Sequence, residues 1–142
     1  MAKELGDEKV SVILNPPRCT PASWEQQRCQ VPSTSPSTIQ ILVNHNVNVG
    51  LAMSEDNFQR GLIWEAGWAR ADAPKTLTTH KAIGLVTWNI AKAYGIQDSG
   101  AGSIRVGDRV NALLYSGEPG RLSSHLWLLL DGPRIICNPK QV

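Results

Sequence analysis

The first third of the chain contains short runs of β-branched residues separated by turn-forming residues. Residues 10–14 form one run that stops at two prolines, which predicts a short strand. Residues 39–43 and 47–51 form two more runs, and the triplet Asn44-His45-Asn46 between them favours a turn. This spacing predicts a β-hairpin.

The middle of the chain carries apolar residues at helical spacing. Ser54 is a favourable N-cap and Pro74 ends the first run, which predicts a helix over residues 55–71. A second and more apolar helix is expected over residues 79–94, because Gly95 is suited to end it. The buried stripe of this second helix would consist of Ala82, Ile83, Val86, Ile90, Ala93 and Tyr94.

The last third changes to the period of two that strands show. Strands are expected over residues 109–115, 124–130 and 134–137, joined as an antiparallel meander that packs on the second helix. The predicted fold class is therefore α+β, with a central helix packed on an antiparallel sheet. We expect a single domain over residues 1–142.

Length and composition fit one folded domain. The 142 residues are 42% hydrophobic and 18% charged, with five Trp, which is enough for a real core. The net charge of +2 is spread along the chain without a basic run, so nucleic acid is not an expected partner. No apolar stretch reaches 18 residues and residues 1–9 are charged, so neither a membrane span nor a signal peptide is expected. These features predict a cytoplasmic protein, or one exported without a signal peptide by an apparatus that accepts folded cargo.

The three cysteines form no recognisable framework. Cys19, Cys29 and Cys137 are odd in number and match no zinc-site spacing, so a structural metal is not expected. We expect reduced thiols, with a bridge between Cys19 and Cys29 as the alternative.

Several short segments of the second half carry a resemblance to a known family. These are Gly84-Leu85-Val86, Ala91 to Ile96, Gly107-Asp108-Arg109-Val110 and Ser124 to Gly132. They resemble the papain-like cell-wall hydrolases of the NlpC and CHAP type, in which a nucleophilic Cys starts a central helix and a catalytic His opens a later strand. The resemblance implies a papain-like fold and a cysteine amidase or peptidase, with residues 79–138 as its catalytic half. Its substrate would be a small peptide, above all a peptidoglycan fragment.

The resemblance also assigns roles to three residues. It places the nucleophile at Ala82, two residues before Gly84, the general base at His125 and the orienting residue at Asn138. A thiol at a helix N-terminus beside an imidazole is activated for attack on an amide, whereas an alanine methyl cannot attack a carbonyl. We therefore expect a form that lacks its nucleophile and is inactive as written. It would need no metal or organic cofactor, and its partners would be a peptide or peptidoglycan fragment and an inhibitor or immunity protein.

Other interpretations use different residues. Residues 61–71 resemble the Glu-x-Gly-x-Ala segment of nucleoside deoxyribosyltransferases, in which Glu65 would be the nucleophile. A non-enzymatic, β-rich binding or assembly module would instead use tryptophans as interface anchors, and Trp64 and Trp68 lie four residues apart on one predicted helix. A thiol hydrolase could also be built on Cys19. Read without any resemblance, Ala82 is a core alanine on a buried helix face.

Overall fold

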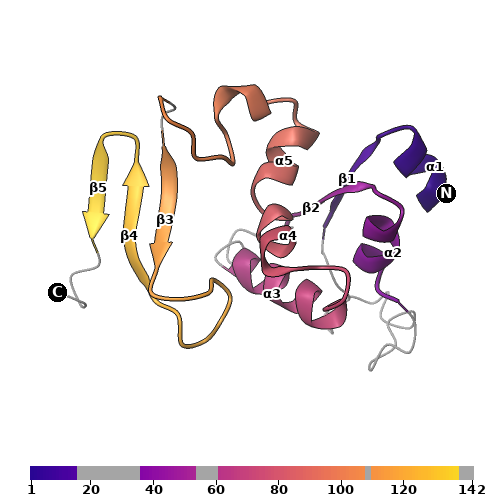
Figure 1. The fold of residues 1–142 in the computed structure, drawn as a ribbon, viewed down its shortest axis with the longest axis horizontal. Coiled ribbons are helices and arrows are strands. Elements are labelled where there is room, and N and C mark those ends of the chain that lie inside the picture. Colours follow the sequence, from indigo (N-terminus) through magenta and orange to yellow (C-terminus); the bar gives the residue numbers. More distant parts are fainter. Residues whose placement is uncertain (16–35, 54–60, 108–109, 138–142) are drawn as a thin grey trace.

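The structure is a computed structural model that describes residues 1–15, 36–53, 61–107 and 110–137. Two groups of strands lie at separate places along the molecule, with the helices around the first group (Figure 1). The helices are α1 (Ala2–Asp7), α2 (Thr38–Asn44), α3 (Leu62–Asp72), α4 (Thr79–Gly84), α5 (Trp88–Ala93) and the short 3₁₀ helix η3 (Gln97–Ser99). The strands are β1 (Ser11–Leu14), β2 (Asn48–Leu51), β3 (Asn111–Tyr115), β4 (Leu126–Asp131) and β5 (Arg134–Cys137).

The first sheet is a parallel pair, in which Ser11 of β1 is opposite Asn48 of β2 and Leu14 is opposite Leu51. The strand expected over residues 10–14 is therefore confirmed as β1. The connection that returns from β1 to β2 contains α2, as the crossover between parallel strands requires. Strand β2 contributes the most deeply buried side chains of the pair, because Val49 and Leu51 are both fully buried.

The predicted hairpin over residues 39–51 is wrong, because its first half is helix α2. Ser37 caps this helix, since its Oγ accepts a hydrogen bond from the backbone N–H of Gln40 at 3.2 Å. Ile39 and Leu42, three residues apart, place their side chains in the core. The expected turn is present, and Asn46 has a φ of 59°, a left-handed conformation that asparagine tolerates well. The burial of Ile39 and Leu42 on one face of a helix thus outweighs the strand propensity of the β-branched residues in this segment.

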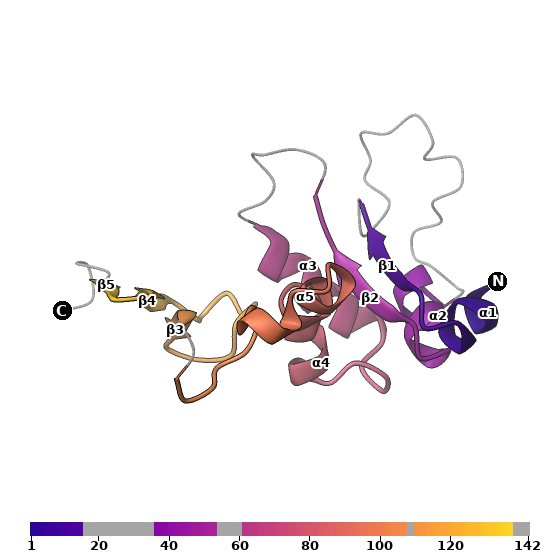
Figure 2. The same cartoon turned by 90° about the horizontal axis from the view of Figure 1, so that it is seen from above.

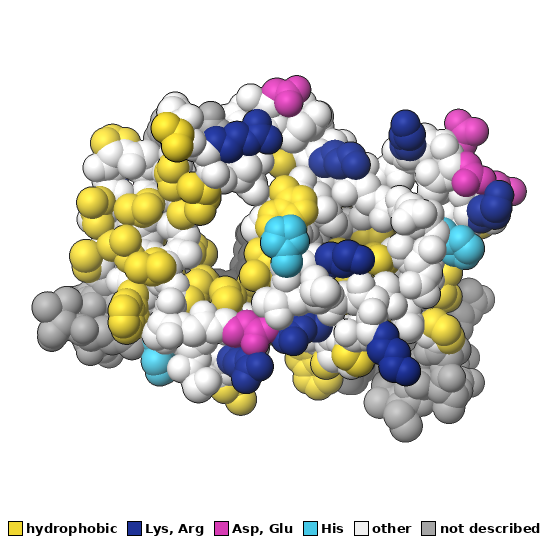
Figure 3. All heavy atoms as spheres, in the orientation of Figure 1, with side chains coloured by type: hydrophobic (Ala, Val, Ile, Leu, Met, Phe, Trp, Pro, Cys, Tyr) yellow, Lys and Arg dark blue, Asp and Glu magenta, His cyan; other side chains and the backbone are white. Residues whose placement is uncertain are grey.

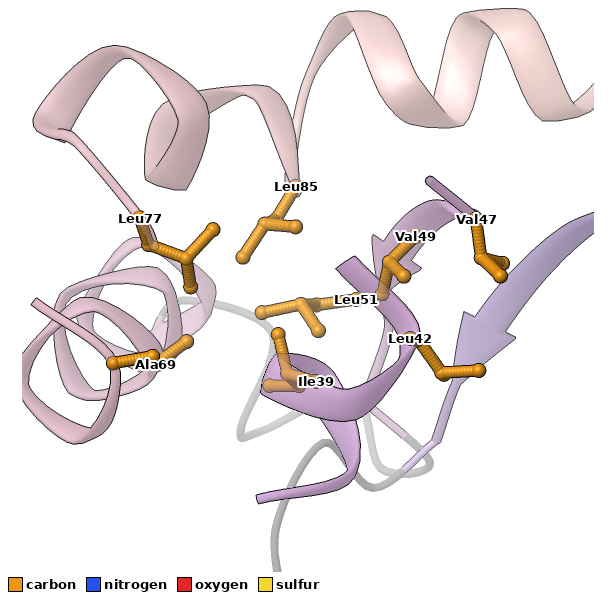
Figure 4. Packing of buried hydrophobic residues seen from close by; sticks show 9 residues of the cluster. Ile39, Leu42, Val47, Val49, Leu51, Ala69, Leu77 and Leu85 are labelled. Atoms are coloured by element: carbon orange, nitrogen blue, oxygen red, sulfur yellow. The ribbon is translucent and has the colours of Figure 1, made fainter. Parts of the chain in front are cut away.

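The core forms where helices α2, α3 and α4 meet strand β2. Side chains from these elements point toward one another around Leu51 (Figure 4). Helix α5 packs on both β1 and β2. Two side-chain amides strengthen this contact: Asn48 Nδ2 donates to the Asn89 carbonyl at 2.9 Å, and Asn89 Nδ2 donates to the Val49 carbonyl at 2.8 Å. The buried residues of the cluster are Ile39, Leu42, Val47, Val49, Leu51, Ala69, Ala73, Leu77 and Leu85.

The helix expected over residues 79–94 is interrupted at Leu85, Val86 and Thr87. The interruption frees the Leu85 carbonyl, which accepts a hydrogen bond from the Leu51 N–H at 2.8 Å and so ties the chain to the end of β2. Thr87 Oγ1 donates to the Ile83 carbonyl at 2.8 Å, which bridges the break. A Cβ at Gly84 would lie only 2.6 Å from the Trp88 ring, so the ring packs where any other residue would clash. The predicted end at Gly95 is confirmed, with a φ of 68°.

The antiparallel meander of the last third is confirmed. Strand β4 lies between β3 and β5, with Leu129 opposite both Leu113 and Ile136. The predicted packing of this sheet on the second helix is wrong. Among the described elements, β3, β4 and β5 make their substantial contacts with one another. Both ribbon views place the sheet at one end of the molecule, apart from α4 (Figures 1 and 2).

Both faces of this sheet carry exposed apolar side chains. Leu113 is 51% exposed and its neighbour Leu114 is 52% exposed, although consecutive strand residues point to opposite faces. Ile135 and Ile136 are exposed in the same way on β5. Hydrophobic side chains gather over β3, β4 and β5 on the face seen in Figure 3, and an open gap separates them from the helices. The described part of the chain therefore covers neither face of the sheet.

The mixture of helices and strands bears out an α+β composition, whereas the central helix on an antiparallel sheet is replaced by helices around a parallel pair. The other long helix predicted, over residues 55–71, is observed as α3, and residues 54–60 lie outside the described ranges. Across the described ranges, no helix has the length and apolar character needed to cross a membrane.

We predict that Leu51→Ala lowers the free energy of unfolding by roughly 2–5 kcal/mol, because the truncation leaves a cavity at the centre of the core. Urea denaturation followed by circular dichroism measures this change. Leu122→Ala is the matched control, since Leu122 is 90% exposed and its truncation should change stability by less than about 0.5 kcal/mol. Equal losses in the two variants would show that the core is not built around β2.

Candidate functional site

A cavity of about 440 Å³ lies between helices α3 and α4 and the loop that joins β3 to β4. This volume falls within the range of small-molecule sites in proteins. Its wall is mainly apolar, with a few polar and charged side chains. The lining residues are Ile63, Trp64, Ala66, Gly67, Trp68, Arg70 and Ala71 of α3, Thr79, Ala82 and Ile83 of α4, and Glu118, Pro119, Gly120, Arg121 and Leu122 of the loop.

The loop lies against helix α3 at Gly67 and Gly120. A Cβ at Gly67 would lie 3.6 Å from the Gly120 carbonyl oxygen, and a Cβ at Gly120 would lie 3.4 Å from the Ile63 carbonyl oxygen. Gly120 also has a φ of 86°, a conformation that glycine adopts without strain. The loop therefore passes over α3 at van der Waals distance and forms one side of the cavity.

Glu118 holds the loop in this position through three hydrogen bonds. Its Oε1 accepts from Arg70 Nη1 of α3 at 2.5 Å and from Thr79 Oγ1 of α4 at 2.6 Å, while its Oε2 accepts from Arg121 Nε at 2.6 Å. The hydrogen bonds from Thr79 and Arg121, together with the charges of Arg121 and Arg70, hold the pKa of Glu118 below its usual value against the opposing effect of desolvation. One carboxylate thus links two helices and the loop.

Ala82 lies in the cavity wall, where it is buried. It is the fourth residue of α4, and its N–H already donates to the Thr78 carbonyl at 2.9 Å. Thr78 is the N-cap of this helix, because its Oγ1 accepts from the Lys81 N–H at 3.3 Å. The Thr79 hydroxyl is used instead to bind Glu118.

His125 is not among the residues that line the cavity with Ala82. It is exposed and precedes strand β4, where its backbone closes the β3–β4 hairpin: the N–H donates to Ser116 Oγ at 2.9 Å and the carbonyl accepts from the Ser116 N–H at 2.9 Å. Asn138 lies outside the described residues. The described structure therefore groups Ala82 with Glu118, Arg70 and the tryptophans.

The residues of the other interpretations are also dispersed. Glu65 is buried on α3 but does not line the cavity, whereas Trp64 and Trp68 of the same helix do. Cys137 is exposed on β5, and Cys19 and Cys29 lie outside the described residues.

Comparison with known proteins relates the chain to amidohydrolases. No protein-family model matches it. The amidohydrolase TasK of Hapsidospora irregularis is 30% identical to it over 100 residues, which are 69% of this chain and 10% of TasK. The crystal structure of an amidohydrolase from Thermotoga maritima MSB8 superposes on 95% of this chain with a TM-score of 0.76 and 20% sequence identity, and a second amidohydrolase structure superposes on 96% with a TM-score of 0.64 and 17% identity. This chain spans about a tenth of TasK, and 33% and 37% of the two solved chains.

These similarities correct the expected family and function. The resemblance to NlpC and CHAP hydrolases is wrong, and with it the cysteine amidase or peptidase of peptidoglycan, because the similar sequence and both similar structures are amidohydrolases. The deoxyribosyltransferase and binding-module alternatives gain no support from the comparisons. The structural similarity shows that the chain shares the fold of one part of these larger proteins.

The described residues do not assemble a metal centre. Three or more His, Cys, Asp or Glu side chains usually hold a catalytic metal ion, and no such group occurs within the described ranges. The charged groups that gather at the cavity are Arg70, Glu118 and Arg121, and both arginines form ion pairs with Glu118. We therefore assign no chemical step to a metal ion held by this part of the chain.

Sequence reasoning missed the Glu118 cluster, although the predicted meander places residues 116–123 in the connection between two strands. The available signal was Glu118 and Arg121 on either side of Pro119-Gly120, an acid and a base three residues apart across a turn. The partners on α3 and α4 are 48 and 39 residues away in sequence, which no local pattern connects.

We predict that Glu118→Gln lowers stability near neutral pH and that this difference from the native chain shrinks in acid. The pKa of Glu118 is depressed in the folded protein, so its stabilising contribution is present above the unfolded pKa of about 4.3 and is lost as the pH falls through the folded pKa. Thermal unfolding of both proteins between about pH 7 and pH 3 measures this dependence. Glu8→Gln, at an exposed position, is the control and should unfold like the native chain at every pH. A Glu118→Gln difference that stays constant or grows toward low pH would contradict the assigned ion pairs.

Proposed function

We propose that this chain is one segment of an amide-bond hydrolase of the amidohydrolase type. In that enzyme it would supply the β1–α2–β2 unit with its helices and the β3–β5 meander, and further polypeptide would supply the rest of the fold. The observation that carries this proposal is the coverage of the fold match: 95% of this chain superposes on an amidohydrolase with a TM-score of 0.76, yet it accounts for only 33% of that protein.

The surface of the described residues supports the need for further polypeptide. A parallel sheet normally has both faces covered and seldom consists of two strands, because each strand edge leaves backbone groups without a partner. Here β1 and β2 pair only with each other within the described residues. The meander exposes apolar side chains on both faces, as soluble proteins do where another segment packs.

The proposed reaction is hydrolysis of a carbon–nitrogen amide bond, because the similar protein and both similar structures are amidohydrolases. The described residues of this chain would position the fold, and the groups that activate water would come from other parts of the enzyme. In the cavity, Arg70 and Arg121 both form ion pairs with Glu118. These pairs fit a role in positioning the fold rather than in activating water.

We predict that this chain restores amide hydrolysis when it replaces the matching third of the Thermotoga maritima amidohydrolase. The assay is amine release, followed by mass spectrometry, from an aryl amide or N-acyl amino acid that the intact Thermotoga protein hydrolyses. The truncated Thermotoga protein without the replacement and the 142-residue chain by itself should release no amine, because each lacks part of the fold.

Two results would contradict the proposal. One is amine release by the 142-residue chain alone at the rate shown by the chimera. The other is a chimera that is monomeric and folded by circular dichroism but hydrolyses nothing that the intact Thermotoga protein hydrolyses.

A further inference from the structure

The cavity between α3, α4 and the β3–β4 loop combines an apolar wall with an excess of positive charge. The aromatic part of the wall comes from Trp64 and Trp68, which lie one helical turn apart on α3 and are both open to solvent. Trp68 is 55% exposed on α3, and Leu122 is 90% exposed on the β3–β4 loop. A flat apolar molecule between them would remove this surface from water, which is favourable in proportion to the area buried.

The charged part of the cavity carries two arginines and one carboxylate. Arg70 and Arg121 are the cationic lining residues, and Glu118 is the acidic residue among those that line it. The structure shows one N–H group of each guanidinium directed to Glu118, at Nη1 of Arg70 and at Nε of Arg121. A guanidinium has five N–H donors in a planar fork that matches a carboxylate. The cluster can therefore hold a second carboxylate beside Glu118, and its net charge of one positive unit favours an anion.

We propose that this cavity binds a small organic carboxylate with a flat apolar body. The ring system packs between Trp64, Trp68 and Leu122, and the carboxylate accepts hydrogen bonds from the N–H groups of Arg70 and Arg121 that do not contact Glu118. Glu118 positions both guanidiniums and sets the spacing of their donors. The site does not depend on the proposed hydrolase function, because it is built from the described residues of this chain alone.

The charge of the ligand is tested with three probes that share one ring system. These are 1-naphthoate, neutral 1-naphthamide and cationic 1-naphthylmethylammonium, titrated into the 142-residue chain by isothermal calorimetry. We expect 1-naphthoate to bind about tenfold more tightly than 1-naphthamide, since hydrogen bonds to a charged group are stronger than those to a neutral one. The cation should bind most weakly of the three.

The place of binding is tested with exposed residues, whose substitution leaves the fold intact. Trp68→Ala should weaken 1-naphthoate at least fivefold, whereas Trp127→Ala, which removes a tryptophan that is 51% exposed on β4, should leave binding unchanged. Arg121→Gln should remove most of the preference for 1-naphthoate over 1-naphthamide, and Arg134→Gln on β5 is its matched control. Circular dichroism confirms that each variant is folded, and Leu122→Ala should also weaken 1-naphthoate, because it removes an apolar side chain of the cavity wall.

Three results would overturn the proposal. The first is no heat of binding for 1-naphthoate at millimolar concentration. The second is equal affinity for the carboxylate, the amide and the ammonium probe, which would mean that the arginines do not recognise the ligand. The third is an equal loss of affinity in Trp127→Ala and Trp68→Ala, which would place the probe on the exposed meander rather than in the cavity.

Discussion

The hydrogen bond from the Leu51 N–H to the Leu85 carbonyl is the contact on which the arrangement of this fold depends. The Leu85 carbonyl can accept this bond because it does not accept one from a helical N–H. The helix that begins at Thr79 is therefore interrupted where it meets the end of β2. Leu51 and Leu85 are both fully buried beside the bond, which shields it from water. The interruption gives α4 and α5 separate directions. Helix α5 then packs on β1 and β2, while α4 presents Thr79 and Ala82 to the cavity.

The walls of the cavity are held together by a second set of contacts, between residues that are far apart in the sequence. Glu118 binds Arg70 and Thr79 from two different helices, so the β3–β4 loop is fixed to the helices even though the strands on either side of it stand apart. The close passage of Gly120 over Gly67 completes this attachment. The exposed meander is therefore attached to the helices through this ion-paired loop. The charges of Glu118 and Arg121 on the loop cancel, so Arg70 of α3 supplies the net positive charge of the cavity.

Local patterns in the sequence were sufficient for the elements whose stabilising contacts are also local. The meander followed from the period of two along its three strands, and the helix end followed from Gly95. The hairpin failed because Ile39 and Leu42 satisfy helical spacing as well as strand propensity, and the Ser37 cap decides between them. The break at Leu85 depends on a strand 34 residues earlier, and the Glu118 cluster on partners still further away. The cysteine-hydrolase resemblance failed because a Gly-Asp turn and a His before an apolar strand occur in many unrelated hairpins, and here His125 closes one with its backbone.

The parallel pairing of β1 with β2 distinguishes this account most directly from a fold with a hairpin over residues 39–51. Nuclear Overhauser contacts between backbone protons, measured on the isotope-labelled chain, report strand pairing. The account predicts contacts that link Val12 with Val49 and Leu14 with Leu51, together with helical contacts between residues three apart from Thr38 to Asn44. Cross-strand contacts between residues 39–43 and 47–51, without contacts between β1 and β2, would contradict it.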